Sequence, residues 1–199
     1  SRSCQAVLAR TPNLRELGFC GPLISKSGDL TFPDLSDKNH LETLKLLNTS
    51  TVICGTTSSL CDLIKFPEKL KRLTLSGTNL KWSEMWILGI LPNLEVLKLK
   101  FHACVGPQWE TCDGGFGRLK FLKFEDLDIV RWNASINHFP ALQRLVLQSC
   151  GKLEGIPLDL GDISTLEIIE LNWCSQSATE SARLIRQEQE KMGNDLLKI

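Results

Sequence analysis

Cysteine and histidine are the residues of this sequence that could bind a metal or act as nucleophiles. Their densest group is His102, Cys104 and Cys112. Three potential ligands without a second close pair fit zinc poorly, so we expect no metal site. The remaining cysteines are Cys4, Cys20, Cys54, Cys61, Cys150 and Cys174, and no CxxC pair occurs. This spread is typical of reduced thiols rather than of a disulfide framework.

Other signatures of catalysis or cofactor binding are missing from the sequence as well. The three histidines, His40, His102 and His138, do not accompany a serine or cysteine in a recognisable nucleophile setting. No GxxxxGK[ST] occurs, and no GxGxxG follows a strand, so we expect no phosphate-binding loop. We therefore expect no enzyme activity in this chain and no cofactor.

Charge is balanced over the whole chain but not along it. The 23 basic and 23 acidic side chains cancel, so no overall field recruits nucleic acid or a membrane surface. Residues 1–100 carry 13 basic and 9 acidic side chains, whereas residues 101–199 carry 10 and 14. No apolar run reaches 18 residues, so we expect no transmembrane segment.

A leucine pattern recurs seven times and must position all of these side chains. It consists of a leucine, two residues, an aliphatic residue, one residue and a leucine or phenylalanine. The matches begin near residues 14, 41, 70, 94, 119, 142 and 166, at steps of 23 to 29 residues. This is a leucine-rich repeat, in which each coil buries its apolar face only against the next. We expect an α/β solenoid, a horseshoe of about seven to eight coils with one parallel sheet on its concave face.

The arcs that connect the strands are expected to be mostly irregular. NTSTVICGTTSSL at residues 48–60 and FHACVGPQWETCDGGFG at residues 101–117 are interpreted as bulging loops on the convex or lateral side. Residues 14–175 form the repeats in this interpretation, and residues 1–13 are the remnant of a cut repeat. An end without a cap exposes core leucines, so we expect the chain to be part of a longer protein.

A capping helix and tail are expected over residues 176–199. Ser177 is a plausible N-cap. One face of this helix is expected to carry Ala178, Ala182, Ile185, Gln189 and Met192.

Alternate residues of each strand are expected to face the concave surface, where solenoids usually bind extended partners. In the second to sixth coils these positions carry six cations and one anion, and Val96 and Phe121 add an apolar pair beside Lys98 and Lys123. A basic surface with a central aromatic residue is typical of a protein-binding hot spot. The candidate partner-binding residues are Lys45, Arg72, Val96, Lys98, Lys100, Phe121, Lys123, Glu125, Arg144, Val146, Gln148 and Glu170.

Simpler explanations exist for these residues. Exposed strand positions also favour lysine, arginine and threonine for solubility. Nucleic acid is not an expected partner, because a single central phenylalanine makes no stacking platform.

Cys150 and Cys174 each follow the first leucine of their coil by eight residues, so we interpret both as small residues of the repeat lattice that turn inward.

Three stretches carry a resemblance to a known family. They are LPNLEVLKLK at 91–100, FPALQRLVLQSCGKLEGIPLDLGDISTLEIIELNWCS at 139–175 and SARLIRQEQEKMGND at 181–195. The chain resembles the C-terminal leucine-rich repeat region of plant intracellular immune receptors of the coiled-coil, nucleotide-binding type. In particular, it resembles the late-blight-resistance-like group of nightshades. The resemblance is strong over the C-terminal 110 residues and looser over residues 1–90.

The resemblance implies a region that recognises a pathogen effector, directly or through a guarded host protein. It also implies that the region holds a nucleotide-binding switch domain inactive, with ATP or ADP bound in that domain rather than in this chain. The first repeats of such receptors are basic and contact the switch. Lys65, Lys69, Lys71, Arg72 and Lys81 are the candidate intramolecular patch, and a cytoplasmic location is implied.

Two other functions remain open at this stage. The substrate-recognition repeats of a ubiquitin ligase would require an F-box helix bundle upstream of Ser1. An extracellular repeat receptor would use the glycosylation sequons at Asn48 and Asn133, or a disulfide between Cys104 and Cys112. Reduced thiols would instead favour the cytosol.

Overall fold

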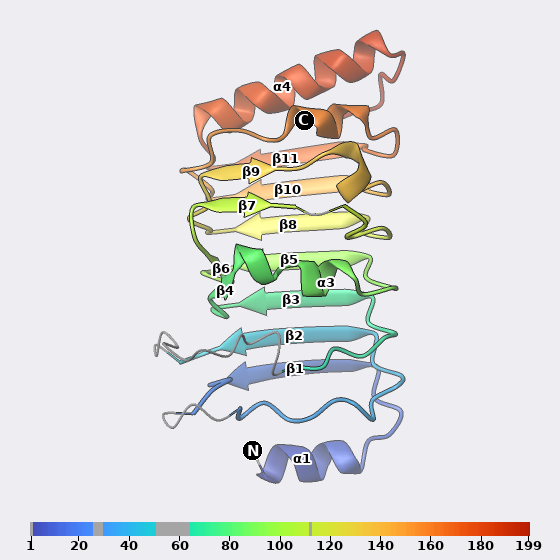
Figure 1. The fold of residues 1–199 in the computed structure, drawn as a ribbon, viewed down its shortest axis with the longest axis vertical. Helices are drawn as coiled ribbons and strands as arrows, with labels where there is room; N and C mark the ends of the chain where they lie inside the picture. The colour runs from blue at the N-terminus through green and yellow to red at the C-terminus, as the bar shows by residue number, and fades with distance from the viewer. Residues whose placement is uncertain (1, 26–29, 51–63, 112) are drawn as a thin grey trace.

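The fold is a stack of parallel strands, one from each repeat (Figure 1). The computed structural model describes residues 2–25, 30–50, 64–111 and 113–199. The strands of the main sheet are β1 (Glu16–Gly21), β2 (Thr43–Asn48), β3 (Arg72–Ser76), β5 (Val96–Lys100), β8 (Phe121–Glu125), β10 (Arg144–Gln148) and β11 (Ile168–Asn172). They pair in sequence order, and every pair is parallel. The expected leucine-rich repeat solenoid is confirmed, although seven strands bound six turns rather than seven to eight.

Buried leucines fix the register of the sheet. The second aliphatic position of each repeat pairs with its equivalent in the next strand. From β2 to β11 these residues are Leu44, Leu73, Leu97, Leu122, Leu145 and Ile169, each 0% exposed. A slip of one residue would turn every leucine to solvent and bring lysines into the core. The leucine spacing therefore decides which side chains reach the other face.

Five strands are followed at once by a residue with a left-handed backbone. These residues are Gly77, Phe101, Asp126, Ser149 and Trp173, with φ between +43° and +66°. The N–H groups of the first four donate to carbonyl oxygens of the following coil at 2.8 to 2.9 Å. At Gly77 the close approach requires glycine, because a Cβ there would lie 2.7 Å from the carbonyl oxygen of Asn48.

The return arcs form a second layer, which we call the arc layer. It contains β4 (Leu80–Lys81), η1 (Trp82–Glu84), α3 (Trp86–Gly89), β6 (Cys104–Val105), β7 (Gln108–Glu110), β9 (Arg131–Asn133), η2 (Ile136–His138) and η3 (Leu158–Asp162). β4 pairs with β6, and β7 pairs with β9, both in parallel. The arcs are thus more regular than expected. Of the loop expected at 48–60, residues 51–60 lie outside the described residues.

The expectation of an irregular loop at 101–117 is wrong in its central part. Two short strands occupy that part, and Trp109 at the middle of β7 is only 1% exposed. Its indole stacks between those of Trp82, at 5.1 Å, and Trp132, at 5.6 Å, in ring-centroid distance. Phe124 of β8 lies 5.8 Å from Trp109, so this aromatic column joins the arc layer to the sheet. Burying several large rings supplies much of the core here.

Helix α4 (Gln176–Lys191) covers one end of the stack, as expected (Figure 1). Its N-cap is Ser175, whose Oγ accepts the N–H of Ala178 at 3.0 Å, so the N-cap expected at Ser177 is two residues too late. Four of the five residues expected on the inner face are buried, namely Ala178, Ala182, Ile185 and Gln189, whereas Met192 is 61% exposed. The amide of Gln189 donates to the carbonyl of Ile163 at 2.9 Å, which ties the helix to the last arc.

The C-terminal tail closes the outer edge of β11. Lys198 pairs with Ile168 as an isolated parallel bridge. Its N–H donates to Glu167 O and its carbonyl accepts from Ile169 N, both at 2.9 Å. Unpaired strand edges invite association with other strands, so the tail protects this end of the sheet.

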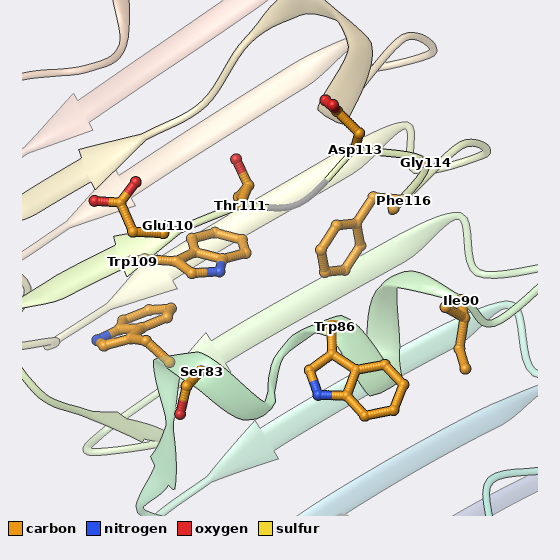
Figure 2. A pocket seen from close by; sticks show the side chains of 11 residues that line it. Ser83, Trp86, Ile90, Trp109, Glu110, Thr111, Asp113, Gly114 and Phe116 are labelled. Carbon is orange, nitrogen blue, oxygen red and sulfur yellow. The ribbon is translucent and has the colours of Figure 1, made fainter.

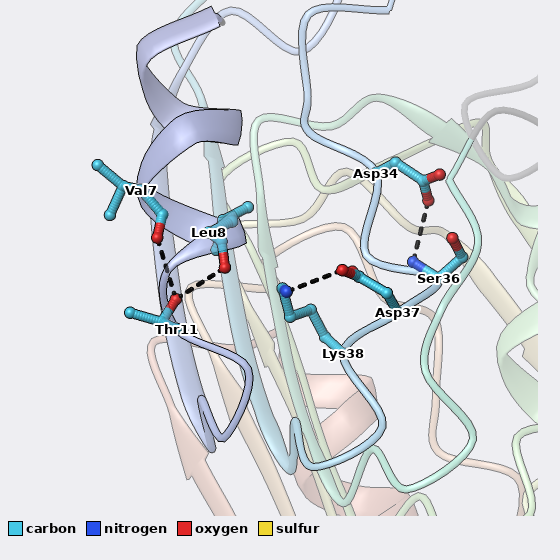
Figure 3. Close-up of polar contacts among 7 residues, drawn as sticks. All are labelled: Val7, Leu8, Thr11, Asp34, Ser36, Asp37 and Lys38. Carbon is cyan, nitrogen blue, oxygen red and sulfur yellow. Dashed lines mark hydrogen bonds and ion pairs between the residues drawn. The ribbon is translucent and has the colours of Figure 1, made fainter.

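Helix α1 (Arg2–Ala9) lies at the opposite end, beyond β1 (Figure 1). Figure 3 shows the end of this helix, where Thr11 Oγ1 donates to the carbonyls of Val7 and Leu8 at 3.3 and 3.1 Å. Nearby, the Lys38 side chain is 3% exposed and its Nζ lies 3.0 Å from a carboxylate oxygen of Asp37. The interpretation of residues 1–13 as a cut repeat, and the boundaries at 14–175 and 176–199, stay predictions.

Candidate functional site

Three rows of side chains form the open face of the sheet, which we define as the face that points away from the leucine core. The first row is Glu16, Thr43, Arg72, Val96, Phe121, Arg144 and Ile168. The second is Gly18, Lys45, Thr74, Lys98, Lys123, Val146 and Glu170. The third is Cys20, Leu47, Ser76, Lys100, Glu125, Gln148 and Asn172. All twelve candidate partner-binding residues belong to these rows, so the structure brings them together on one surface.

Phe121 lies in the first row of the open face with a cation on either side. Lys98 Nζ is 5.3 Å from the ring centroid, and the guanidinium carbon of Arg144 is 5.8 Å from it. Each such contact contributes about 0.5–1 kcal/mol at an exposed site. Val96 is the row neighbour of Phe121 in β5. The ring is therefore held in a defined position while it stays partly accessible.

Glu125 is the acceptor of a compact charge network. Its Oε2 lies 2.9 Å from Lys100 Nζ and 2.6 Å from Lys123 Nζ. These contacts are ion pairs rather than well-angled hydrogen bonds. Burial acts to raise the pKa of Glu125, but the contacts with Lys123 and Lys100 outweigh it and hold that pKa below its ordinary value. Lys123 also donates to Gln148 Oε1 at 2.9 Å.

The charged groups nearest to Lys98 are mostly other lysines. Lys98 forms no ion pair with any carboxylate of the described residues, and its row neighbour in β8 is Lys123. Burial lowers the pKa of Lys98, and the charges of Lys100, Lys123 and Lys45 lower it further, against a smaller opposite effect of Glu125. The open face around Phe121 and Lys98 thus combines an aromatic ring with a positive charge that forms no ion pair with a carboxylate of the described residues.

The remaining candidates on this face are partly engaged with one another. Lys45 forms an ion pair with Glu16 at 2.6 Å, and Arg144 forms one with Glu170. Exposed pairs of this kind contribute little to stability. Little folding free energy would therefore be lost if Lys45 or Arg144 paired with a partner's carboxylate instead. Val146 points toward the open face but is only 6% exposed, so it offers little surface to a partner.

The five residues expected to form an intramolecular basic patch are divided between the main sheet and the arc layer. Lys65, Lys69 and Lys71 precede β3, and Arg72 begins it. Lys81 lies in β4, beyond the other end of β3. Lys71 forms an ion pair with Glu42 at 3.3 Å. The structure therefore places Lys69, Lys71 and Arg72 together at the start of β3, with Lys65 in the segment before it, and Lys81 apart from them in the arc layer.

Cys150 and Cys174 are neighbouring free thiols at the ends of their strands. Cys150 is 0% exposed and its Sγ donates to Gln148 O at 3.5 Å, while Cys174 Sγ donates to Leu147 O at 3.4 Å. The Cys150 S–H can donate to a Cys174 thiolate instead, which lowers the pKa of Cys174 to about 6; the same interaction, together with burial, raises the pKa of Cys150. Cys150 is therefore a buried lattice residue, as its spacing predicts.

The candidate metal ligands can be followed only in part, because Cys112 lies outside the described residues. His102 is exposed, whereas Cys104 is buried with its Sγ 3.6 Å from Met85 Sδ. Within the described ranges, no group of three potential ligands lies close enough to hold a metal ion. No helix within those ranges could span a membrane.

The side chain of Asn48, the first residue of one glycosylation sequon, forms hydrogen bonds within the fold. Asn48 Oδ1 accepts the N–H of Leu23 at 3.1 Å, and Nδ2 donates to the carbonyl of Gly77 at 2.8 Å. A glycan on Nδ2 would replace a donor that joins β2 to the turn after β3. The Asn133 amide is exposed and donates to Glu110 at 2.7 Å.

A pocket in the arc layer was not anticipated from the sequence (Figure 2). Trp109 and Phe116 lie at its centre, with Trp86 and Ile90 on one side and Glu110, Thr111 and Asp113 on the other. It is an open depression, and its volume of about 430 Å³ includes space continuous with the solvent. Trp86 is 54% and Ile90 63% exposed. Tryptophan and isoleucine four residues apart are typical of a buried helix face, which is why the sequence alone conceals this site.

Comparison with known proteins places the chain beside one group of plant proteins. It is 34% identical over 94% of its length to a late blight resistance protein homolog of Solanum demissum, and 34% identical over 93% to two others from that plant, R1B-13 and R1B-16. It spans 15%, 16% and 14% of their respective lengths. No protein-family model matches the chain. The resemblance to the late-blight-resistance-like group is thus confirmed, and it extends over the N-terminal repeats as well.

Proposed function

We propose that the chain is a protein-recognition region of a plant disease-resistance receptor, and that the open face is its binding surface. The observation that carries this proposal is the cluster of Val96, Phe121 and Lys98. This cluster exposes apolar surface beside the positive charge of Lys98. Lys98 forms no ion pair with a carboxylate of the described residues. Hot spots combine a central aromatic or arginine anchor with a polar rim. Relatives named for late blight resistance support the receptor context.

The partner in this proposal is a pathogen effector, or a host protein that the receptor guards, with an acidic surface opposite Lys98. Charges of opposite sign speed up association and select the partner, while Phe121 supplies the apolar anchor. Binding rather than catalysis is the role proposed for every residue of this face.

The test is an immune-response assay in leaf tissue. A receptor that contains this region is expressed together with a library of effectors, and cell death is scored at equal receptor abundance. Phe121→Ala and Lys98→Glu should each abolish the response to the recognised effector. Lys191→Glu is the matched control, because it reverses one exposed charge on α4, away from the open face. An undiminished response of both open-face variants would refute the proposed surface.

We further propose that the edge formed by Lys65, Lys69, Lys71 and Arg72 contacts a nucleotide-binding switch domain in the full receptor and restrains it. ATP or ADP would be bound in that domain, and Lys81 is left out of the proposed contact because it lies in β4 of the arc layer. A ligand can release such a switch only by binding the released state more tightly. Charge reversal at Lys69, Lys71 and Arg72 should therefore cause cell death without any effector. If the triple variant stays silent and still co-precipitates the switch domain as the wild type does, the contact lies elsewhere.

A further inference from the structure

Two thiols occupy equivalent positions on the last two coils of the stack. Cys150 and Cys174 each lie two residues beyond the paired residues Gln148 and Asn172, which end β10 and β11. The residue before each cysteine has the same left-handed backbone, with φ of +54° and +57°, so the chain turns in the same way at both positions. Neighbouring parallel strands lie about 4.8 Å apart. This spacing falls within the Cα separation of about 4.4–6.8 Å that a disulfide requires.

The hydrogen bonds of the two thiols place their sulfur atoms together. Cys150 Sγ donates to Gln148 O at 3.5 Å, and Cys174 Sγ donates across the coils to Leu147 O at 3.4 Å. When Cys174 is ionised, its sulfur can accept both the S–H and the backbone N–H of Cys150. Cys174 Sγ therefore lies against the neighbouring coil, within hydrogen-bonding reach of Cys150 Sγ.

The two thiols differ in ways that suit the two steps of disulfide formation. Cys174 is partly exposed, and its pKa of about 6 makes it mostly a thiolate at pH 7. The thiolate is the form that reacts with oxidants. Cys150 is 0% exposed, so it meets no oxidant directly and reacts only with a sulfur beside it.

We propose that Cys150 and Cys174 form an oxidation site, at which a peroxide converts the pair into a disulfide between the last two coils. The Cys174 thiolate attacks one oxygen of hydrogen peroxide and becomes a sulfenic acid, while the other oxygen leaves as hydroxide. The Cys150 sulfur then attacks the sulfenic sulfur, and the departing hydroxyl group takes the Cys150 proton and leaves as water. Overall, a thiolate, a thiol and a peroxide give a disulfide, a hydroxide and a water.

The first step removes the charge that opposes the second. Hydrogen bonding to the Cys174 thiolate is the main reason why the pKa of Cys150 is raised, and this negative charge is gone once Cys174 is a sulfenic acid. In the reduced chain both cysteines stay lattice residues. Disulfides that form in a reducing compartment are usually transient and redox-sensing. This inference does not depend on the recognition surface proposed above.

Peptide mapping of the 199-residue chain tests the proposal. The reduced, folded chain is treated with a small excess of hydrogen peroxide, denatured, alkylated and digested with trypsin without reductant. Trypsin releases Cys150 in the peptide 145–152 and Cys174 in the peptide 153–183, each with a single cysteine. The two peptides should appear as one cross-linked species that a reductant separates, and it should be the main disulfide product. If both peptides are recovered alkylated, or are linked mainly to other cysteines, the proposal is wrong.

Two variants test the order of the steps. Cys150→Ser keeps a hydrogen-bond donor beside Cys174 but removes the sulfur that completes the disulfide, so dimedone should trap a sulfenic acid at Cys174. Cys174→Ser should leave Cys150 as a thiol after the same treatment, because Cys150 is 0% exposed. Cys20 is the internal reference, since it is more exposed than Cys174 and yet should be labelled more slowly. Faster labelling of Cys20 would contradict the role given to Cys174.

Urea unfolding shows whether the bond fits the native coils. The disulfide closes a loop over residues 150–174, which contains η3 and β11. Closing a loop of about 25 residues should raise the urea midpoint of the oxidised chain by about 1 M. Cys174→Ser, treated in the same way, should show no rise. An unchanged or lower midpoint of the oxidised wild type would mean that the bond distorts the coils, and would overturn the assignment of this site to the native fold.

Discussion

Replacing Glu125 by glutamine tests whether the charge network under the open face contributes to folding. The substitution preserves size and removes one charge, which leaves Lys100 and Lys123 facing each other without their shared carboxylate. The side chains of Glu125, Lys100 and Lys123 are 12%, 28% and 18% exposed. Exposed ion pairs contribute less than about 1 kcal/mol, and breaking a fully buried pair costs about 3–5 kcal/mol. For this intermediate burial we expect the free energy of unfolding to fall by about 2 kcal/mol.

Urea unfolding followed by circular dichroism at pH 7 measures this loss. With a slope of about 2.5 kcal/mol per molar urea, the midpoint should drop by about 0.8 M. Glu170→Gln is the matched control on the same face, because its pair with Arg144 is 36% and 45% exposed. It should cost about 0.5 kcal/mol or less.

The dependence on pH separates charge from packing. The pKa of Glu125 in the folded chain lies below its ordinary value of 4.5, so its charge stabilises the fold fully above pH 4.5. That contribution is lost as the pH falls through the folded pKa. The difference between wild type and Glu125→Gln should therefore be constant above pH 4.5 and shrink below it. A loss under about 0.5 kcal/mol at pH 7, the range of an exposed pair, or a difference that persists at low pH would refute this account.

Three further substitutions test the fold by urea unfolding. Gly77→Ala should cost about 2 kcal/mol or more, because φ is +66° and the new Cβ would meet the Asn48 carbonyl oxygen at 2.7 Å; a neutral effect would show that the turn adjusts freely. Trp173→Gly should raise the free energy of unfolding by about 0.5 kcal/mol, since it relieves φ of +57° at a side chain that is 87% exposed; a clear loss would mean that the indole packs on the protein. Asp37→Asn should cost about 1.5–3 kcal/mol, because it leaves the buried Lys38 ammonium without its carboxylate, and Lys38→Met in the same background should restore most of that loss.

The strands and the faces of their side chains could be predicted from the sequence, because the leucine spacing within a single strand determines which residues face the core. A strand alternates its side chains strictly, so the positions of Leu97 and Leu122 determine that Lys98 and Lys123 face outward. The same logic places Cys150 inside at the end of its strand. Residues that follow the repeat are therefore predictable one coil at a time.

The arcs could not be predicted in this way, because their packing depends on neighbours about 25 residues away. Trp109 lies in a stretch rich in glycine and polar residues, which resembles a loop, yet Trp82 and Trp132 from adjacent coils build the column that buries it. Trp86 is the opposite case: tryptophan is a residue type expected in the core, yet this side chain is 54% exposed. The ion pair between Lys100 and Glu125 could not be predicted either, because it depends on the register between β5 and β8.

The most direct test of the central claim is the response of a receptor that contains this region when the open face alone is changed. The double variant Phe121→Ala, Lys98→Glu is compared with Lys191→Glu at equal protein abundance, with both chains shown to be folded by circular dichroism. The proposed function predicts that effector-triggered cell death is lost in the double variant and retained in the control. A full response from the double variant would contradict it and place recognition on another surface.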